Sequence, residues 1–164
     1  GEYIAAGTGS NFYLFDRNSS TPIWSYDDGC NSQNTVAISE DGEYLATAKN
    51  SKLYFFSRGT STPLATFSCG GFVTSISISA DGEYIVCGAY DGRLKLFGKD
   101  SNSALWSYDS GEDEDFWDVA ISSDGHYIVA GTAWGSDSDT VIAAENKSRT
   151  TIFTISGESF IYSM

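Results

Sequence analysis

Two stretches of the chain gather acidic side chains in a way that could bind a cation. The first, residues 109–118, holds six acids and no base within ten residues. The second, residues 133–140 with the sequence AWGSDSDT, adds two aspartates. Calcium takes several carboxylate oxygens as ligands, although neither stretch has the DxDxDG spacing of an EF-hand. The acids therefore predict a calcium site, a contact for a basic partner, or a solvated charged surface.

Both stretches interrupt an internal repeat, and functional residues are often carried by such insertions. Trp134 has no counterpart in the other repeats and is the strongest single candidate for a ligand or partner contact. The candidate contact residues are Trp134, Asp137, Asp139, Glu112, Asp113, Glu114 and Asp115. The weaker calcium candidates among them are Asp113, Asp115, Asp137 and Asp139.

The sequence offers no recognisable catalytic set. His126 is the only histidine, and its place beside an Asp-Gly turn predicts a solvated side chain. One histidine supplies neither a facial triad nor a Cys/His zinc set, and a serine nucleophile would have only this imidazole as its base. No glycine-rich loop precedes a helix. We therefore expect no catalytic residues, no cofactor and no enzymatic activity.

Cysteines and glycosylation patterns are the remaining chemical features. Cys87 lies in an apolar run, which predicts a small buried side chain, whereas Cys30 and Cys69 occupy matching loops and could form a disulfide. Glycosylation acceptor patterns begin at Asn18 (NSS) and Asn146 (NKS), in matching turns that we expect to be exposed.

Net charge, hydropathy and length limit the kinds of partner and the domain organisation that we expect. The net charge of -13 repels nucleic acid and anionic membrane, and favours a basic surface, a cation or an extracellular setting. No apolar run reaches the roughly 20 residues of a membrane helix, so we expect no membrane insertion. The 164 residues fit a single domain, 1–164. Because the sequence begins with glycine rather than methionine, we expect a removed leader or a segment of a longer protein.

An internal repeat predicts the strands that position the candidate residues. Gly1, Gly42, Gly82 and Gly125 are separated by 41, 40 and 43 residues, and each is followed two residues later by tyrosine. A fixed period near 40 that contains several short strands indicates a propeller or a solenoid.

Local patterns give the strand order within each repeat. VAIS (36–39) and SISIS (75–79) are β-branched, and each leads to an Asp-Gly pair that suits a tight hairpin with positive φ. Each repeat is thus a four-stranded antiparallel meander whose two apolar faces need neighbouring sheets. Recurring aromatic residues, expected to pack between sheets, are Trp24, Trp106 and Tyr127. The expected blades span residues 1–26 (completed by 159–163), 35–68, 73–109 and 117–155.

These residues carry a family resemblance. DGEYLATAKNSKLYFF resembles a WD-repeat blade, and residues 89–111 (AYDGRLKLFGKDSNSALWSYDSG) resemble the tryptophan-docking repeat of pyrroloquinoline-quinone-type propellers. The closing Trp-Asp of WD repeats is missing, and we interpret FWD (116–118), at the start of a strand, as coincidence. The resemblance implies an all-β propeller with about four four-stranded antiparallel blades. They could form a closed small ring, a half-ring that pairs with a second copy, or part of a larger propeller.

The function expected from these features is a non-catalytic interaction or structural module. Its setting is an extracellular or cell-surface assembly, with the cytoplasm as the alternative, and its partner is another protein or a second copy. A ligand-binding or sensory propeller for sugar or Ca²⁺ is the second interpretation. A fragment of a quinoprotein-type enzyme is the third, because propeller blades serve several unrelated activities.

Overall fold

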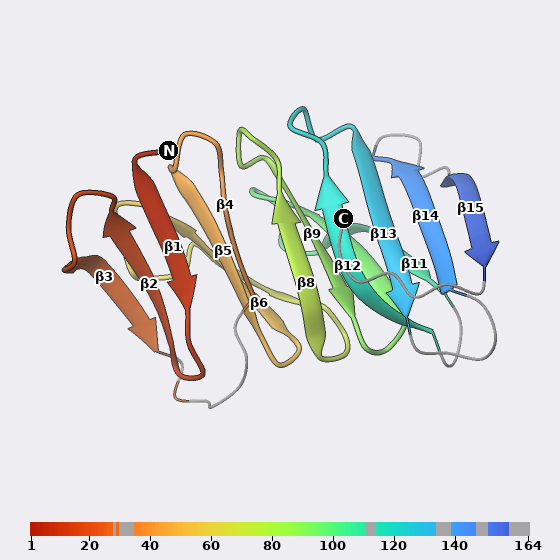
Figure 1. Ribbon diagram of the computed structural model, residues 1–164, viewed down its shortest axis with the longest axis horizontal. Helices are drawn as coiled ribbons and strands as arrows, with labels where there is room; N and C mark the ends of the chain where they lie inside the picture. Colours follow the sequence, from red (N-terminus) through yellow and green to blue (C-terminus); the bar gives the residue numbers. More distant parts are fainter. Residues whose placement is uncertain (28, 30–34, 111–113, 134–138, 147–150, 158–164) are drawn as a thin grey trace.

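The computed structural model shows an all-β protein of four antiparallel sheets set side by side in an arc (Figure 1). It describes residues 1–27, 29, 35–110, 114–133, 139–146 and 151–157; for 133, 139 and 151–157 only the backbone is described. No helix that could span a membrane occurs among these residues. The predicted all-β fold with four-stranded antiparallel meanders is confirmed.

The sheets follow one another along the chain. The first sheet has three strands, β1 (Tyr3–Gly7), β2 (Asn11–Asp16) and β3 (Pro22–Asp27). The second has four strands, β4 (Thr35–Ile38), β5 (Tyr44–Lys49), β6 (Lys52–Ser57) and β7 (Ala65–Ser68). The third has β8 (Val73–Ile78), β9 (Tyr84–Ala89), β10 (Arg93–Gly98) and β11 (Ala104–Asp109). The fourth has β12 (Asp115–Ile121), β13 (Tyr127–Ala133), β14 (Asp139–Glu145) and β15 (Thr151–Gly157).

In the second, third and fourth sheets the Asp-Gly turn between the first two strands is built in the same way. In the third sheet, Ser79 Oγ donates to Asp81 Oδ1 at 2.6 Å, the same carboxylate oxygen accepts from the Glu83 amide at 3.0 Å, and Ser79 Oγ accepts from the Tyr84 amide at 3.0 Å. Gly82 has φ of 71°, a left-handed conformation that glycine adopts without strain. The predicted positive φ of the hairpin is therefore confirmed.

Each sheet meets the next through a tyrosine and a glycine. A Cβ built on Gly82 would lie 2.8 Å from the Cβ of Tyr44 in the preceding sheet, and one built on Gly125 would lie 3.1 Å from Cε2 of Tyr84. Only glycine leaves room for the ring, which explains why glycine and tyrosine recur together in the repeat.

The hydrophobic core lies between the sheets rather than within any one of them. Phe12 and Leu45 belong to a cluster between the first and second sheets, and Phe55 and Ile85 belong to one between the second and third. Phe116 is part of the cluster between the third and fourth sheets. These side chains are buried, and each contributes roughly 1.5–3 kcal/mol of hydrophobic stabilisation. The stacking of sheets therefore holds the fold together.

The arc is open. In Figure 1, β3 and β15 lie at opposite ends of the long axis of the molecule, so the first and fourth sheets are not neighbours. The small closed ring is thus not formed, because sheets that close a ring must pack against each other. Residues 159–163, expected to complete the first sheet, lie outside the described residues.

Two expectations about packing are wrong. Tyr127 is 51% exposed, because it belongs to the last sheet of the arc and no further sheet covers it in the described structure. Cys69 pairs with Cys87 in a disulfide, with the Cα atoms 6.5 Å apart, instead of with Cys30. Cys69, directly after β7, and Cys87 of β9 belong to the same buried cluster between the second and third sheets, and Cys30 lies outside the described residues. Trp24 and Trp106 pack between sheets as predicted.

Candidate functional site

Most of the acidic and aromatic contact candidates cannot be placed. Glu112, Asp113, Trp134 and Asp137 lie outside the described residues, and Asp139 is described only as backbone at the start of β14. Their roles as contacts or calcium ligands stay predictions. No group of three or more metal-ligating side chains occurs within the described part of the chain.

Part of the described acidic stretch helps to join the third and fourth sheets. Glu114 and Asp115 are half-buried at the start of β12, and the Glu114 carbonyl oxygen accepts from Ser110 Oγ at 2.9 Å. Asp118 Oδ1 accepts from Ser75 Oγ in β8 at 2.7 Å. Asp118 therefore takes part in the contact between the third and fourth sheets.

The two glycosylation candidates lie in different environments. Asn18 is exposed in the turn after β2, as predicted. Asn146 is only 8% exposed, and its Nδ2 donates to the Gly125 carbonyl oxygen at 3.0 Å. The expectation that Asn146 is exposed is wrong, because the end of β14 folds back onto the Asp-Gly hairpin and its amide is used there.

His126 occupies the exposed turn position that the sequence indicates. Its Nδ1 lies 3.2 Å from the Asp124 carbonyl oxygen and 3.4 Å from Asp124 Oδ2. The hydrogen bond from Ser122, together with the His126 amide, lowers the pKa of the Asp124 carboxyl below its usual value. These contacts stabilise the hairpin, and they describe a turn rather than an acid–base pair.

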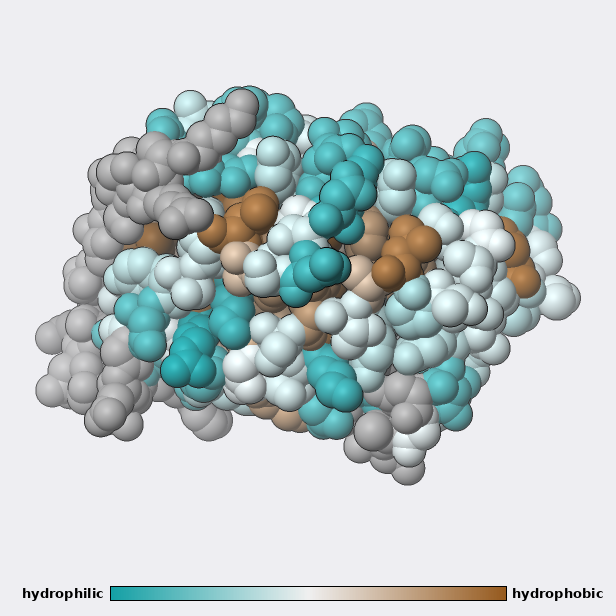
Figure 2. Space-filling view, turned by 180° about the vertical axis from the view of Figure 1, so that it is seen from behind, coloured by the Kyte–Doolittle hydropathy of each residue, from teal (hydrophilic) through white to brown (hydrophobic). Residues whose placement is uncertain are grey.

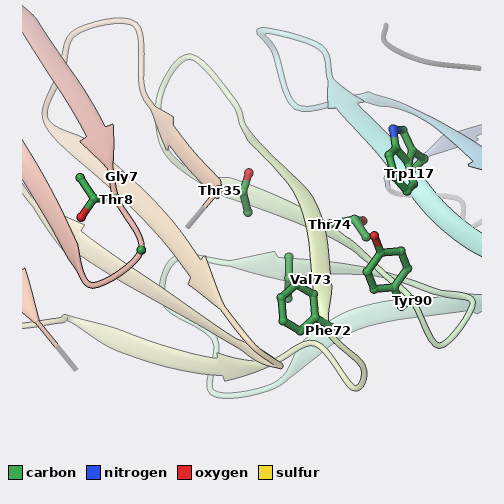
Figure 3. Close-up of a pocket in the computed structure, with 9 residues that line it drawn as sticks. Gly7, Thr8, Thr35, Phe72, Val73, Thr74, Tyr90 and Trp117 are labelled. Carbon is green, nitrogen blue, oxygen red and sulfur yellow. The ribbon is translucent and has the colours of Figure 1, made fainter. Parts of the chain in front are cut away.

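A pocket of about 510 Å³ receives residues from all four sheets (Figure 3). The first sheet supplies residues 7–9 and the second supplies Thr35. The third sheet supplies residues 72–74 and Tyr90, and the fourth supplies Trp117. These residues lie in loops and at strand ends on the face of the arc that carries the β1–β2 and β9–β10 turns.

Three aromatic rings form a row along this pocket, here called the aromatic row: Phe72, Tyr90 and Trp117. The rings of Phe72 and Tyr90 stack with centroids 5.8 Å apart and an interplanar angle of 28°. The ring centroids of Tyr90 and Trp117 lie 6.2 Å apart, and the interplanar angle of the two rings is 57°. Phe72 is 38% exposed and Tyr90 is 43% exposed. An exposed row of large rings at the mouth of a pocket is a surface suited to binding a partner.

A β-bulge directs Trp117 into the pocket. Phe116 pairs with Thr132 and Asp118 pairs with Gly131, so Trp117 is the extra residue of β12. β8 has the same irregularity at Thr74, between Val73 and Ser75. A bulge turns its extra side chain away from the regular alternation and is a common device beside functional sites.

The loop that carries Phe72 is held in place from both sides. The amide of Tyr90 donates to the Phe72 carbonyl oxygen at 2.9 Å, which ties two members of the aromatic row together. A Cβ on Gly71 would lie 2.7 Å from Asp91 Cβ, so the loop passes close to the turn that follows β9. Cys69, three residues before Phe72, is fixed to β9 by its disulfide. The row is therefore anchored before any partner binds.

Two of the threonine hydroxyls that line the pocket are engaged with the backbone. Thr74 Oγ1 lies 2.6 Å from the carbonyl oxygen of Phe116 and 3.0 Å from that of Gly88. Thr8 Oγ1 lies 3.2 Å from the carbonyl oxygen of Asn11 and accepts from its amide at 3.0 Å. These two hydroxyls therefore have backbone partners within hydrogen-bond distance.

Comparison with known proteins agrees with this architecture. The family described as WD domain, G-beta repeat, matches residues 61–98, which run from β7 to the end of β10. The fold is a β-propeller arc. A structure of Kuenenia stuttgartiensis hydrazine synthase matches with a TM-score of 0.80 at 16% sequence identity. The match covers 96% of this chain and 47% of that chain, so this propeller arc spans about half the length of that structure.

These matches define the architecture and no activity. No curated protein matches the sequence. In contrast, 1345 chains of solved structures match, and a fold shared that widely serves many functions. The resemblance to WD-repeat blades predicted from the sequence is confirmed.

Sequence reasoning missed all three members of the aromatic row. Trp117 belongs to FWD (116–118), which the sequence pattern alone indicates as coincidence because FWD does not stand where a WD repeat ends. Phe72 and Tyr90 stand next to glycine-containing turns, GGF (70–72) and YDG (90–92), and large aromatic residues beside such turns are the signal that could have indicated them. The bulge that aims Trp117 has no comparable signature in a single sequence.

Proposed function

We propose that this chain is a non-catalytic binding module that recognises a segment of a partner protein with its aromatic row. The observation that carries this proposal is the row itself: Phe72, Tyr90 and Trp117 come from two adjacent blades and line one pocket. Exposed aromatic rings bury large areas at little entropic cost, and such residues dominate the binding energy of protein interfaces.

The charge of the chain supports a basic partner segment. A net charge of -13 draws positively charged groups toward the surface and raises their rate of encounter. Once in the pocket, an arginine or lysine side chain can lie over the ring of Tyr90 or Trp117, a contact worth about 0.5–2 kcal/mol. The proposed ligand is therefore an extended peptide segment that inserts a cationic side chain among the rings.

Two observations support an extracellular or cell-surface setting for this module. The disulfide between Cys69 and Cys87 is of a kind that persists in oxidising compartments. Asn18, in an Asn-Ser-Ser pattern, is exposed and accessible for glycosylation. The intact mass of the natural protein, measured before and after deglycosylation, tests this setting.

A selection from a random peptide library tests the proposed function. The library is selected on the wild-type chain and, in parallel, on the variant Tyr90→Ala/Trp117→Ala. We expect the wild type to enrich arginine- or lysine-containing sequences that the variant does not retain. The control variant Leu64→Ala removes an apolar side chain that is 55% exposed outside the pocket, and it should retain the same peptides. Enrichment of one peptide set by both the wild type and the pocket variant would reject the proposal.

A further inference from the structure

The pocket has two unlike walls. Gly7 and Thr8 lie on one side of it, and the aromatic row lies on the other (Figure 3). A Cβ built on Gly9, which also lines the pocket, would meet no atom within 4 Å. The described lining residues include no charged side chain. A bound segment therefore gains its contact area from the rings and has room on the side that faces them.

Backbone groups along the row are already used within the chain. The Tyr90 amide donates to the Phe72 carbonyl oxygen at 2.9 Å, and the Val73 amide donates to the Asn50 carbonyl oxygen at 2.7 Å. Strand addition needs a row of unpaired backbone donors and acceptors. A segment bound at the row must instead gain affinity from its side chains and from a shape that it already has. The polyproline II helix has such a shape, because it needs no backbone hydrogen bonds.

The rings of Tyr90 and Trp117 form a notch that fits a proline ring. Their planes diverge by 57° and their centroids lie 6.2 Å apart, so the two faces are inclined to each other rather than stacked. Phe72 stacks on Tyr90 with an interplanar angle of 28°, which supports Tyr90 in the middle of the row. A proline side chain is compact, apolar and rigid, and its fixed φ is that of the polyproline II helix.

The Tyr90 hydroxyl is a donor for the backbone of such a segment. Tyr90 is 43% exposed, and its hydroxyl has no hydrogen-bond partner among the described residues. The carbonyl oxygens of a polyproline II helix make no internal bonds and are free to accept. Tyr90 therefore offers both an apolar ring face and a hydrogen bond to the same ligand.

We infer that the segment recognised by the aromatic row is a proline-containing polyproline II helix. A proline lies between Tyr90 and Trp117, and a neighbouring carbonyl oxygen accepts from the Tyr90 hydroxyl. The inference rests on the proposed function, whose cationic side chain then lies over the outer face of Trp117. Because the helix is already formed in the free ligand, little chain entropy is lost on binding.

The spacing of the row fits one turn of this helix. Three residues complete a turn of about 9 Å, so residues three positions apart lie on the same face. The ring centroids along the row are separated by 5.8 Å and 6.2 Å, which places Phe72 about one turn from the notch. An apolar residue three positions from the proline therefore contacts Phe72.

The apolar surface elsewhere does not offer a comparable site. Figure 2 shows separate small apolar patches on the back of the molecule among polar side chains, rather than one continuous area. Exposed apolar residues such as Ile23 and Leu64 belong to different blades. Within the described residues, Phe72 and Tyr90 are the exposed aromatic rings that stack on each other.

Calorimetric titration of the peptides selected on the wild-type chain tests the ligand side. We expect these peptides to contain proline with an apolar residue three positions away. Replacing that proline with alanine should weaken binding about 10-fold, because the peptide loses both the ring and its preformed shape. The matched control replaces the residue next to the proline with alanine. That residue lies on another face of the helix, so Kd should not change.

The variant Tyr90→Phe tests the protein side. It keeps the aromatic ring and removes only the hydroxyl, so binding should weaken by about 3- to 10-fold. The melting temperature should stay unchanged, since the hydroxyl has no partner among the described residues of the single chain. In the bound, isotope-labelled peptide, three-bond couplings should give φ near about −75° for the non-proline residues, as in a polyproline II helix.

The outcomes separate this inference from the proposed function. Peptides that require Tyr90 and Trp117 but keep their affinity after proline is replaced would overturn the inference and leave the binding function in place. A bound φ near about −120° or beyond, as in a β-strand, would do the same. Peptides that bind Tyr90→Ala/Trp117→Ala as tightly as the wild type would reject the inference together with the proposed function.

Discussion

Trp117 and Tyr90 come from neighbouring blades, and their ring centroids lie 6.2 Å apart across the pocket. Because β12 and the turn after β9 are fixed by separate sets of backbone bonds, the two rings are positioned independently of any partner. This preorganisation means that little side-chain entropy is lost on binding.

Removal of either ring should weaken binding without unfolding the propeller. For Tyr90→Ala or Trp117→Ala we expect a loss of about 2 kcal/mol, or roughly 30-fold in Kd, for the peptide selected on the wild type. Calorimetric titration measures the loss, and Leu64→Ala serves as the control with unchanged affinity. An unchanged Kd in both pocket variants would mean that the peptide binds elsewhere.

The glycine at a blade junction should tolerate no side chain. In Gly82→Ala the new methyl group would clash with Tyr44, whose Cβ is 2.8 Å away, and would also sit at φ of 71°. We expect a loss of about 2 kcal/mol or more in the free energy of unfolding. Gly59→Ala is the matched control, since no atom lies within 4 Å of its built Cβ and its φ is not positive. Equal stability of the two variants in guanidinium chloride would contradict this role of the junction.

The disulfide should stabilise both the fold and the aromatic row. Cys69 and Cys87 are separated by 18 residues, and closing a loop of that size stabilises by about 3 kcal/mol. Reduction should therefore lower the unfolding midpoint of the wild type and leave that of Cys69→Ala/Cys87→Ala unchanged. Because Cys69 anchors the loop of Phe72, reduction should also weaken peptide binding. A midpoint that does not respond to reductant would show that the two thiols are not paired.

The repeated Ser-Asp hairpins should make stability depend on pH in the acid range. The hydrogen bond from Ser79 lowers the pKa of Asp81, and the bond from the Glu43 amide, followed by that from Ser39, lowers the pKa of Asp41. A lowered carboxyl pKa adds stability above the unfolded-state value of about 3.9, and this stability is lost as the pH falls through the lowered pKa.

Thermal unfolding between pH 6 and pH 2 measures this dependence. The melting temperature should fall below about pH 4. Asp81→Ala should lower stability at pH 6 by about 1–2 kcal/mol, through the loss of two hydrogen bonds, and should reduce the drop at acid pH. A variant whose acid-range drop is as large as that of the wild type would exclude Asp81 as a source of the pH dependence.

Much of the fold could be predicted because its determinants are local. The Asp-Gly pair sets the turn at Gly82, and alternating β-branched residues set the strands on either side. Glycine followed by tyrosine also recurs at the spacing of the junctions. The pocket depends instead on how blades are placed in space. The bulge at Trp117, the approach of Cys69 to Cys87 and the burial of Asn146 all arise from contacts between distant segments.

The indole N–H resonances of the four tryptophans report whether a partner binds at the aromatic row. In the proton–nitrogen spectrum of the full chain, the Trp117 signal is assigned by its disappearance in Trp117→Phe. On titration with the selected basic peptide, we expect the Trp117 resonance to shift strongly, while those of Trp24 and Trp106, packed between blades, stay in place. A Trp117 resonance that does not move while that of Trp134 does would rule out binding at the aromatic row, and would place the binding surface on the acidic insertions instead.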